Sequence, residues 1–201
     1  MPKLYYVPRT RATRPRWLLE ELGVPYELVR LDPKKGETRS PEHRARQPLG
    51  HVPALEDGDV RIFESGAICL YLAERYGEGK LLAPAGTAAR AEAYQWFAFA
   101  LTELEPPLAE ISAEQRRPEG QVDAARIEAA KERFRAAAKA VDGALEGRTY
   151  LLGDTFSAAD VVLGAVLSWG KFAAGLDGLP RASEYLARLK ARPAFKRATG
   201  D

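Results

Sequence analysis

The first 76 residues of the chain alternate between short β-prone runs and stretches with the hydrophobic spacing of helices. The β-prone runs are residues 4–7, 26–31, 53–56 and 60–63. The segment 57–59 reads Asp-Gly-Asp and suits a hairpin turn. Helical spacing of apolar residues predicts one helix that ends at Gly23 and a second helix over 67–76 that ends at Gly77. With a short helix near 41–46, the predicted order is β-α-β-(α)-β-β-α.

Beyond Gly77 the pattern changes and contains no further β-prone run. A stretch rich in glycine, proline and small residues reads as a linker. The helices expected after it cover 88–110, 127–145, 157–172, 181–191 and 193–198. We therefore expect a first domain over 1–77, a linker over 78–86 and an all-helical domain over 87–201.

Two features of the helical half have a local physical reason. Pro106-Pro107 should bend the first long helix, because proline removes a backbone donor and its ring crowds the preceding turn. Ser157 and Asp160 stand at the spacing of a capping box, in which each side chain satisfies a free N–H group. The helix over 157–172 is apolar on nearly all sides and is expected to be buried.

Charge and hydropathy argue against several classes of function. The formal net charge is +2, too small to drive binding to nucleic acid or to a membrane surface. The arginines at 9, 11, 14 and 16 have Glu20 and Glu21 nearby and no alternating aromatics, so they suit a solvated face with one or two anion contacts. Since no apolar run approaches the ~18 residues of a membrane span, we expect neither a span nor a signal peptide.

Cysteine and histidine are too few to suggest redox or metal chemistry. The single cysteine, Cys69, cannot form an intramolecular disulfide, and it falls on the apolar pattern of its helix. We expect it to be buried and structural. The two histidines, His43 and His51, show no metal-ligand spacing. We therefore expect no metal site.

The first candidate cluster, Pro8-Arg9-Thr10-Arg11, directly follows the first strand. Pro15 is tolerated only in the first turn of a helix, so that helix should begin near residue 11 or 12, beside the Thr10 hydroxyl. Free N–H groups and the helix dipole at such a position favour an anion such as a thiolate, and a hydroxyl donor would stabilise it further. The alternative is that Thr10 only caps the helix.

The second cluster, 50–55, contains His51, Val52 and Pro53. If the Val52–Pro53 bond is cis, the N–H and C=O of Val52 can turn outward and pair with an extended peptide, as an added strand does. His51 would then be close enough to reach a ligand carboxylate. The alternative is an edge-strand proline beside a surface histidine.

The third cluster, 63–68, places Ser65 at the start of an amphipathic helix with Glu64 beside it. The hydroxyl and the following N–H groups suit a carboxylate, and the glutamate suits an ammonium group. Together they match the head of an α-amino acid. The alternative is a plain helix cap next to an exposed glutamate.

In order and spacing these clusters resemble the glutathione transferase family, over essentially the full length of the chain. The match is carried by LYYVPRTRATRPRWLLEELGVPYELV, by QPLGHVPALEDGDVRIFESGAICLYLAERYG and by YLLGDTFSAADVVLGAVLSW. The central match, 47–77, is highly specific. The segment 156–160 looks like the family's capping box, and the start of the chain is most similar to bacterial and fungal members with Arg-(Ser/Thr)-Arg.

The resemblance implies a fold and a set of binding residues. The fold is a thioredoxin-like α/β domain followed by an all-helical domain, with a cis bond before Pro53, a hydrophobic co-substrate site facing the helical domain, and usually a dimer. By position, Glu64 and Ser65 match the residues that hold the γ-glutamyl head of glutathione, and Val52 the residue that pairs with the cysteinyl backbone. His51 matches a position often near the glycyl carboxylate.

Two positions depart from the family's usual residues. Gln47 stands where the family more often has asparagine. At the catalytic position, usually Tyr, Ser or Cys, Thr10 falls on the serine of serine-type members and Arg11 on the cysteine of bacterial cysteine-type members. A threonine hydroxyl can still donate a hydrogen bond, Tyr6 is the other nearby donor, and Arg11 could act through its permanent charge. Without a cysteine there, thiol–disulfide exchange through an enzyme cysteine is not expected.

We therefore expect a glutathione transferase that holds glutathione as the thiolate and directs it at a small hydrophobic electrophile or a peroxide. Glutathione would be the co-substrate, with no metal or redox cofactor, and the protein would be a cytoplasmic homodimer. Two alternatives stay open: a non-catalytic member that binds glutathione and carries hydrophobic ligands or contacts a protein, and an interaction module with a decayed site.

Overall fold

The computed structural model describes residues 1–77 and 79–200. Its contacts divide the chain into two units, Met1–Leu82 together with Ala191–Asp201, and Ala83–Lys190. Glu78, at the head of the expected linker, and Asp201, at the end of the expected helical domain, lie outside the described residues. The last helix belongs to the first unit because it packs on that unit's first helix, whereas the sequence groups it with the helical half.

A mixed four-stranded sheet with the order β2-β1-β3-β4 forms the first unit. The strands are β1 (Lys3–Tyr6), β2 (Glu27–Arg30), β3 (Ala54–Asp57) and β4 (Val60–Phe63). β1 runs parallel to β2 and antiparallel to β3, and β3 and β4 form the expected hairpin. All four predicted strands are confirmed: the ends of the first three are shifted by one residue, and the fourth is predicted without a shift.

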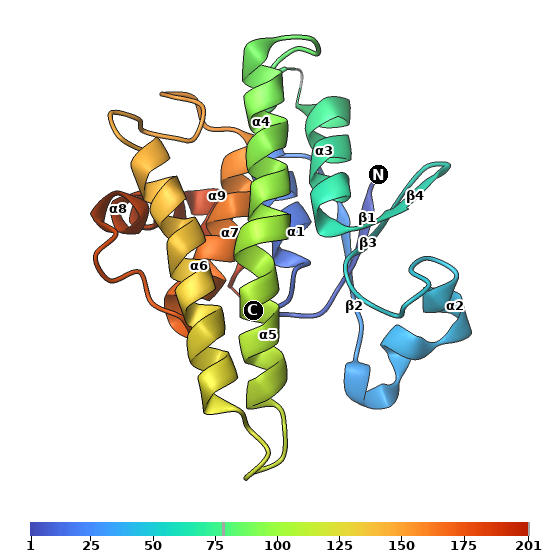
Figure 1. Cartoon of the computed structure of the whole chain (residues 1–201). Helices are drawn as coiled ribbons and strands as arrows, with labels where there is room; N and C mark the ends of the chain where they lie inside the picture. The colour runs from blue at the N-terminus through green and yellow to red at the C-terminus, as the bar shows by residue number, and fades with distance from the viewer. Residues whose placement is uncertain (78, 201) are drawn as a thin grey trace. The chain divides into compact units, whose positions relative to one another are not determined.

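Helices and short helical turns cover both faces of this sheet (Figure 1). They are α1 (Thr13–Leu22), the 3-10 turns Pro33–Lys35 and Glu37–Arg39, α2 (Pro41–Arg44), α3 (Ser65–Tyr76) and α9 (Pro193–Ala198). α1 packs on both α3 and α9, and the rings of Trp17 and Phe195 meet edge to face at 4.9 Å between centroids. Along β1, Tyr6 faces Arg16 of α1 while Tyr5 faces His43 of α2, as alternation along a strand requires.

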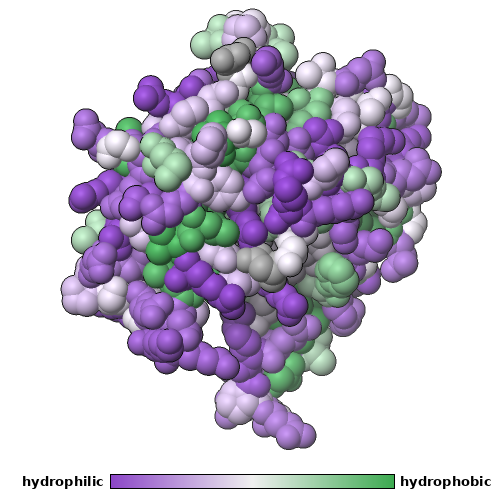
Figure 2. Space-filling model, turned by 180° about the vertical axis from the view of Figure 1, so that it is seen from behind, coloured by the Kyte–Doolittle hydropathy of each residue, from purple (hydrophilic) through white to green (hydrophobic). Residues whose placement is uncertain are grey.

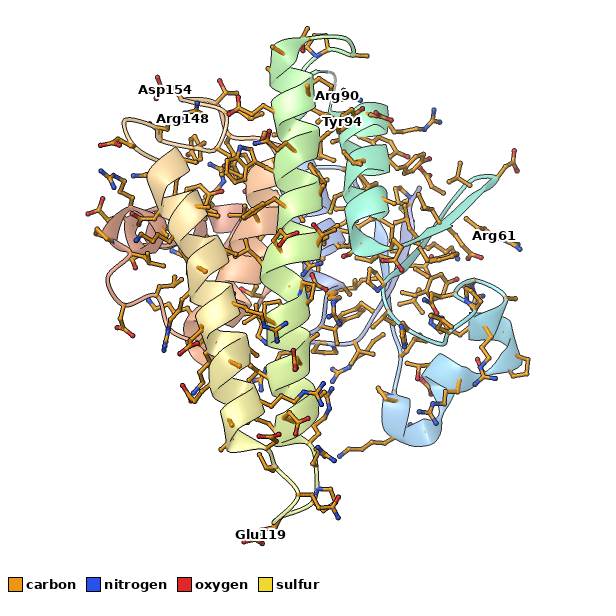
Figure 3. All side chains as sticks on the ribbon, viewed as in Figure 1. Arg61, Arg90, Tyr94, Glu119, Arg148 and Asp154 are labelled. Carbon is orange, nitrogen blue, oxygen red and sulfur yellow. The ribbon has the colours of Figure 1, made fainter. Side chains whose placement is uncertain are left out.

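Among the described residues of the second unit, the regular secondary structure consists of helices. The helices are α4 (Ala88–Phe99), α5 (Glu105–Gln115), α6 (Ala124–Ala144), α7 (Ala158–Ala173) and α8 (Pro180–Ala191). α5 and α6 lie side by side (Figure 1), and α7 is buried along most of its length. Within α4, Arg90 Nε donates to the Tyr94 hydroxyl at 2.7 Å (Figure 3).

The single long helix expected over 88–110 is corrected by the structure. A π-helical segment, Ala100–Leu104, separates α4 from α5, which continues to Gln115. Pro106 and Pro107 have no N–H to offer the carbonyl groups one turn earlier, and their rings crowd that turn. The widened turn just before them is the place where the helix adjusts.

The expected capping box at the start of α7 is confirmed. One carboxylate oxygen of Asp160 accepts the backbone N–H of Ser157 at 2.7 Å and its hydroxyl at 2.8 Å. The other oxygen accepts the Leu151 N–H and the Tyr185 hydroxyl. Burial raises the pKa of Asp160, and these four donors act in the opposite direction.

Hydrophilic side chains predominate on the face shown in Figure 2, with apolar residues in patches between them. None of the helices within 1–77 and 79–200 has the length and apolar character needed to cross a membrane.

A polar network joins the segment around α2 to the sheet. The Tyr5 hydroxyl donates to Glu56 at 2.6 Å, and Arg46 lies over the Tyr5 ring, 4.3 Å from its centroid, while its Nε donates to the same carboxylate. Arg61 of β4 adds a second ion pair to Glu56 (Figure 3). The hydrogen bond from Tyr5 is the largest cause of the lowered pKa of Glu56; partial burial opposes it and the charge of Arg46 assists it.

This network predicts a pH dependence of stability. Because the pKa of Glu56 is lower in the folded state than its ordinary 4.5, its contribution is complete above that value and is lost as pH falls through the folded pKa. Glu56→Gln should therefore lose melting temperature at neutral pH and show a smaller further loss on acidification than the wild type. The control is Glu27→Gln, which removes an exposed ion pair with Lys3. Equal acid sensitivity of Glu56→Gln and wild type would contradict the assignment.

Two helical glycines give a matched test of packing in the second unit. A Cβ on Gly170 of α7 would overlap the Phe134 ring, whereas a Cβ on Gly143 of α6 would meet no atom within 4 Å. Gly170→Ala should lower the free energy of unfolding by about 1–3 kcal/mol through overpacking. Gly143→Ala should raise it by up to about 1 kcal/mol because alanine favours the helix. Thermal and denaturant unfolding measure both, and a stabilised Gly170→Ala would show that this packing is wrong.

Candidate functional site

Three segments that are distant in sequence meet at one edge of the four-stranded sheet. In the strand register Tyr5 lies opposite Ala54, and Ala54 opposite Phe63. The chain beyond this row leads into the turn before α1, the Val52–Pro53 peptide and the start of α3. The sheet thus brings together the three clusters that the sequence singles out.

The start of α3 offers hydrogen-bond donors. Ser65 is its first residue and is 4% exposed, while the preceding Glu64 is exposed and has a positive φ of 69°. Within the described residues, the first-turn N–H groups of residues 65–67 have no hydrogen-bond partner, and Glu64 supplies no side-chain cap. Open N–H groups and the helix dipole make this a favourable position for a carboxylate.

The peptide bond between Val52 and Pro53 is cis, as the resemblance implies. Pro53 is buried and Val52 is half-buried. No residue of the described chain makes a hydrogen bond with the N–H or C=O of Val52. Both groups can therefore pair with the main chain of an extended ligand.

The backbone before this bond is held by two buried side chains. The Gln47 side-chain oxygen accepts the N–H of His51 at 2.8 Å, and Nε2 of His43 donates to the C=O of His51 at 2.8 Å. A carbonyl group can only accept, so Nε2 carries the proton of His43. Gln47 is 2% exposed and in this arrangement supports the loop, while the ring of His51 is exposed.

The turn into α1 differs from the sequence expectation of free N–H groups. Thr10 donates its hydroxyl to the Val7 C=O at 2.7 Å and accepts the Ala12 N–H at 3.3 Å. The Thr10 and Arg11 carbonyl groups accept the next two N–H groups, and α1 begins at Thr13. Arg9 holds this turn with a positive φ of 58°. The turn can still offer a ligand the dipole of α1 and the hydroxyl of Thr10. To bind a ligand, this hydroxyl would first have to break its hydrogen bond to the Val7 C=O.

The two other catalytic candidates lie in different surroundings. Tyr6 is buried, with Arg16 5.4 Å from its ring centroid, and lines a cavity of about 70 Å³ with residues of α1 and of the chain end at Ala198 and Thr199. Arg11 is exposed in the turn before α1. Tyr6 therefore belongs to the α1–α9 side of the sheet.

Sequence reasoning missed two residues that shape this edge, Arg14 and His43. Arg14 is 3% exposed, and its Nη1 donates to the Ser65 hydroxyl oxygen at 2.9 Å. Its spacing from Trp17 and Leu18 places it on the buried face of α1, and this signal could have separated it from the exposed arginines nearby. No pattern in the sequence singles out His43, whose partner is a carbonyl eight residues away.

Cys69 is buried as expected. Burial raises the pKa of its thiol to about 12, although the charge of Arg14 acts to lower it. Such a thiol is neutral at physiological pH and unreactive. Among the described residues, no group of three or more His, Cys, Asp or Glu side chains is arranged to hold a metal ion.

Comparison with known proteins gives the family. Residues 2–74 match the glutathione S-transferase N-terminal domain, and residues 124–188 match the glutathione S-transferase C-terminal domain. Glutathione S-transferase 4 of Zea mays is 34% identical over 187 residues, 88% of this chain and 81% of that protein. A probable glutathione S-transferase of Oryza sativa, GSTF2, is also 34% identical, over 90% of this chain and 86% of that protein.

A solved structure is similar over nearly the whole chain. It is a glutathione transferase family member from Pseudomonas fluorescens with two glutathione molecules bound. Its TM-score is 0.89 at 28% identity, over 98% of this chain and 92% of that one. The expected fold, a thioredoxin-like domain with a helical domain, and the expected enzyme class are confirmed at the level of the family, and the non-catalytic alternative is not favoured. The chain belongs to the glutathione S-transferase family.

Proposed function

We propose that this protein binds glutathione at the edge of its sheet and uses the sulfur as a nucleophile toward a small hydrophobic electrophile or a peroxide. The observation that carries the proposal is the meeting of three open features at that edge. They are the unpartnered first turn of α3, the carboxylate of Glu64 beside it, and the unpaired main-chain groups of Val52. A γ-glutamyl tripeptide needs this combination of donors, acceptor and extended backbone.

Each part of glutathione then has a complementary group. Its γ-glutamyl carboxylate binds the first turn of α3 and the Ser65 hydroxyl, and its ammonium group binds Glu64. The cysteinyl main chain pairs with Val52 next to Pro53, and the glycyl carboxylate lies near His51. Gln47 acts by holding the backbone of His51.

Activation of sulfur is the chemical step that remains. We assign it to Thr10, whose hydroxyl would move from the Val7 carbonyl to the glutathione sulfur when the tripeptide binds, with Tyr6 and Arg11 as the alternative groups. A donated hydrogen bond and the α1 dipole favour the thiolate, so the proton leaves to solvent before sulfur attacks. The groups assigned to this step belong to the chain and to glutathione, and we propose no metal or other cofactor.

We also propose that the enzyme is a homodimer of the cytoplasm. The family resemblance supports the dimer. Two apolar side chains of β4, Val60 and Phe63, are exposed in the single chain and are available to a second copy. Sedimentation equilibrium of the purified protein at micromolar concentration decides between monomer and dimer.

Glutathione binding tests the proposal directly. Ser65→Ala and Glu64→Gln should each weaken the calorimetric affinity for glutathione by about 10-fold or more, because each removes a charge-assisted hydrogen bond. Glu119→Gln is the matched control, since Glu119 lies exposed in the connection between α5 and α6 (Figure 3). Absence of binding heat in the wild type at millimolar glutathione would refute the proposed function.

The assignment of Thr10 has its own test. Thr10→Val keeps the shape of the side chain and removes the hydroxyl, so kcat/KM with an aromatic halide should fall about 10- to 100-fold. The pKa of bound glutathione, read from ultraviolet thiolate absorption, should rise. Thr10→Ser should keep most of the activity, and Tyr6→Phe and Arg11→Gln serve as comparison variants.

If Thr10→Val keeps wild-type turnover while Tyr6→Phe or Arg11→Gln loses it, sulfur is activated by that other group. Glutathione binding by the wild type without turnover on either halides or peroxides would instead favour the non-catalytic ligand carrier.

A further inference from the structure

Arg14 places a buried positive charge between α1 and α3. Arg14 is only 3% exposed, and its guanidinium donates to the Ser65 hydroxyl oxygen across 51 positions of sequence. Guanidinium remains protonated at working pH even when buried. The charge is therefore a permanent part of the interior beneath the start of α3.

The direction of this hydrogen bond fixes the role left to Ser65. A hydroxyl has one hydrogen and two acceptor positions, and guanidinium can only donate. Ser65 must accept from Arg14, so its own hydrogen points elsewhere. Within the described residues no acceptor takes that hydrogen. The contact with Arg14 thus leaves Ser65 as a donor and polarises its O–H bond, which strengthens it as a donor.

The charge of Arg14 is also felt along the first turns of α3. It acts on the thiol of Cys69, one turn beyond Ser65, in the direction that favours an anion. The N–H groups of residues 65–67 have no hydrogen-bond partner among the described residues, and with the helix dipole they give the start of α3 a partial positive charge. The buried guanidinium, the helix dipole and the Ser65 hydroxyl therefore all favour negative charge near the start of α3.

We propose that Arg14 is a positioning residue for glutathione, acting through Ser65: it turns the serine hydroxyl toward the γ-glutamyl carboxylate and adds positive potential beneath it. This inference rests on the proposed function, because it assumes that the carboxylate binds at the start of α3. Arg14 itself does not touch the ligand. It differs in this from Glu64 and Ser65, which bind directly.

A purely structural role for Arg14 makes a different prediction. If it only joins α1 to α3, its loss would lower stability but leave the glutathione affinity of the folded protein unchanged. If it acts mainly through Ser65, its loss would lower affinity much more while the Ser65 hydroxyl is present than in Ser65→Ala. A double-mutant cycle separates the two roles.

The experiment measures glutathione affinity by calorimetry in wild type, Arg14→Met, Ser65→Ala and the double variant. Each single change should weaken binding about 10-fold, and the double variant should be little weaker than Ser65→Ala alone. In the aromatic-halide assay, KM for glutathione should rise in Arg14→Met while kcat at saturation changes little. Arg14→Lys, which keeps a charged donor, should recover part of the affinity.

Arg192→Met is the matched control. It removes an arginine that pairs with Glu21 of α1 through two hydrogen bonds. It should lower the melting temperature without changing glutathione affinity. Arg14→Gln, neutral but polar, replaces Arg14→Met in the cycle if the methionine variant does not fold.

Three results would overturn the inference. They are wild-type affinity in folded Arg14→Met or Arg14→Gln, independent and multiplicative losses in the double variant, and an equal loss of affinity in Arg192→Met. Failure of the proposed function is distinguishable, because wild-type protein would then give no binding heat with glutathione in the first place.

Discussion

The strand register of β1, β3 and β4 is the constraint on which the site depends. It places Tyr5, Ala54 and Phe63 in one row, and from this row the chain continues into the turn before α1, the cis peptide and the start of α3. A slip of one residue would turn every side chain of a strand to the other face. The buried Leu4 and Leu55 on these strands make such a slip costly.

Polar contacts on both faces then fix the turns that the sheet brings together. On one face, Arg14 ties α1 to α3 at Ser65. On the other, Gln47 and His43 hold the main chain of His51 on either side, just before Val52. These side chains are buried and paired, so the groups that remain open at the edge are held by a rigid support. Preorganisation of this kind lowers the entropy lost when a ligand binds.

The elements of the fold were predictable because they follow from local pattern. Alternating and helical hydrophobic spacing gave the four strands and most helix ends, and the Ser157–Asp160 spacing gave the capping box. The position of the π-helical segment was not predictable. The two prolines predict an irregularity in the helix, but they do not specify which turn changes its hydrogen bonding. From local pattern the site was predictable only as three separate clusters, and the resemblance to the family joined them into one expected binding site. The Arg14–Ser65 contact was not, since it joins positions 51 apart and nothing local distinguishes Arg14 as a partner of Ser65.

A crystal structure of the protein with bound glutathione tests the central claim most directly. The account predicts the γ-glutamyl carboxylate within about 3.2 Å of the Ser65 hydroxyl oxygen, the cysteinyl main chain paired with Val52, and the sulfur at the same range from the Thr10 hydroxyl. Glutathione bound away from the start of α3, with Val52 unpaired, would contradict it.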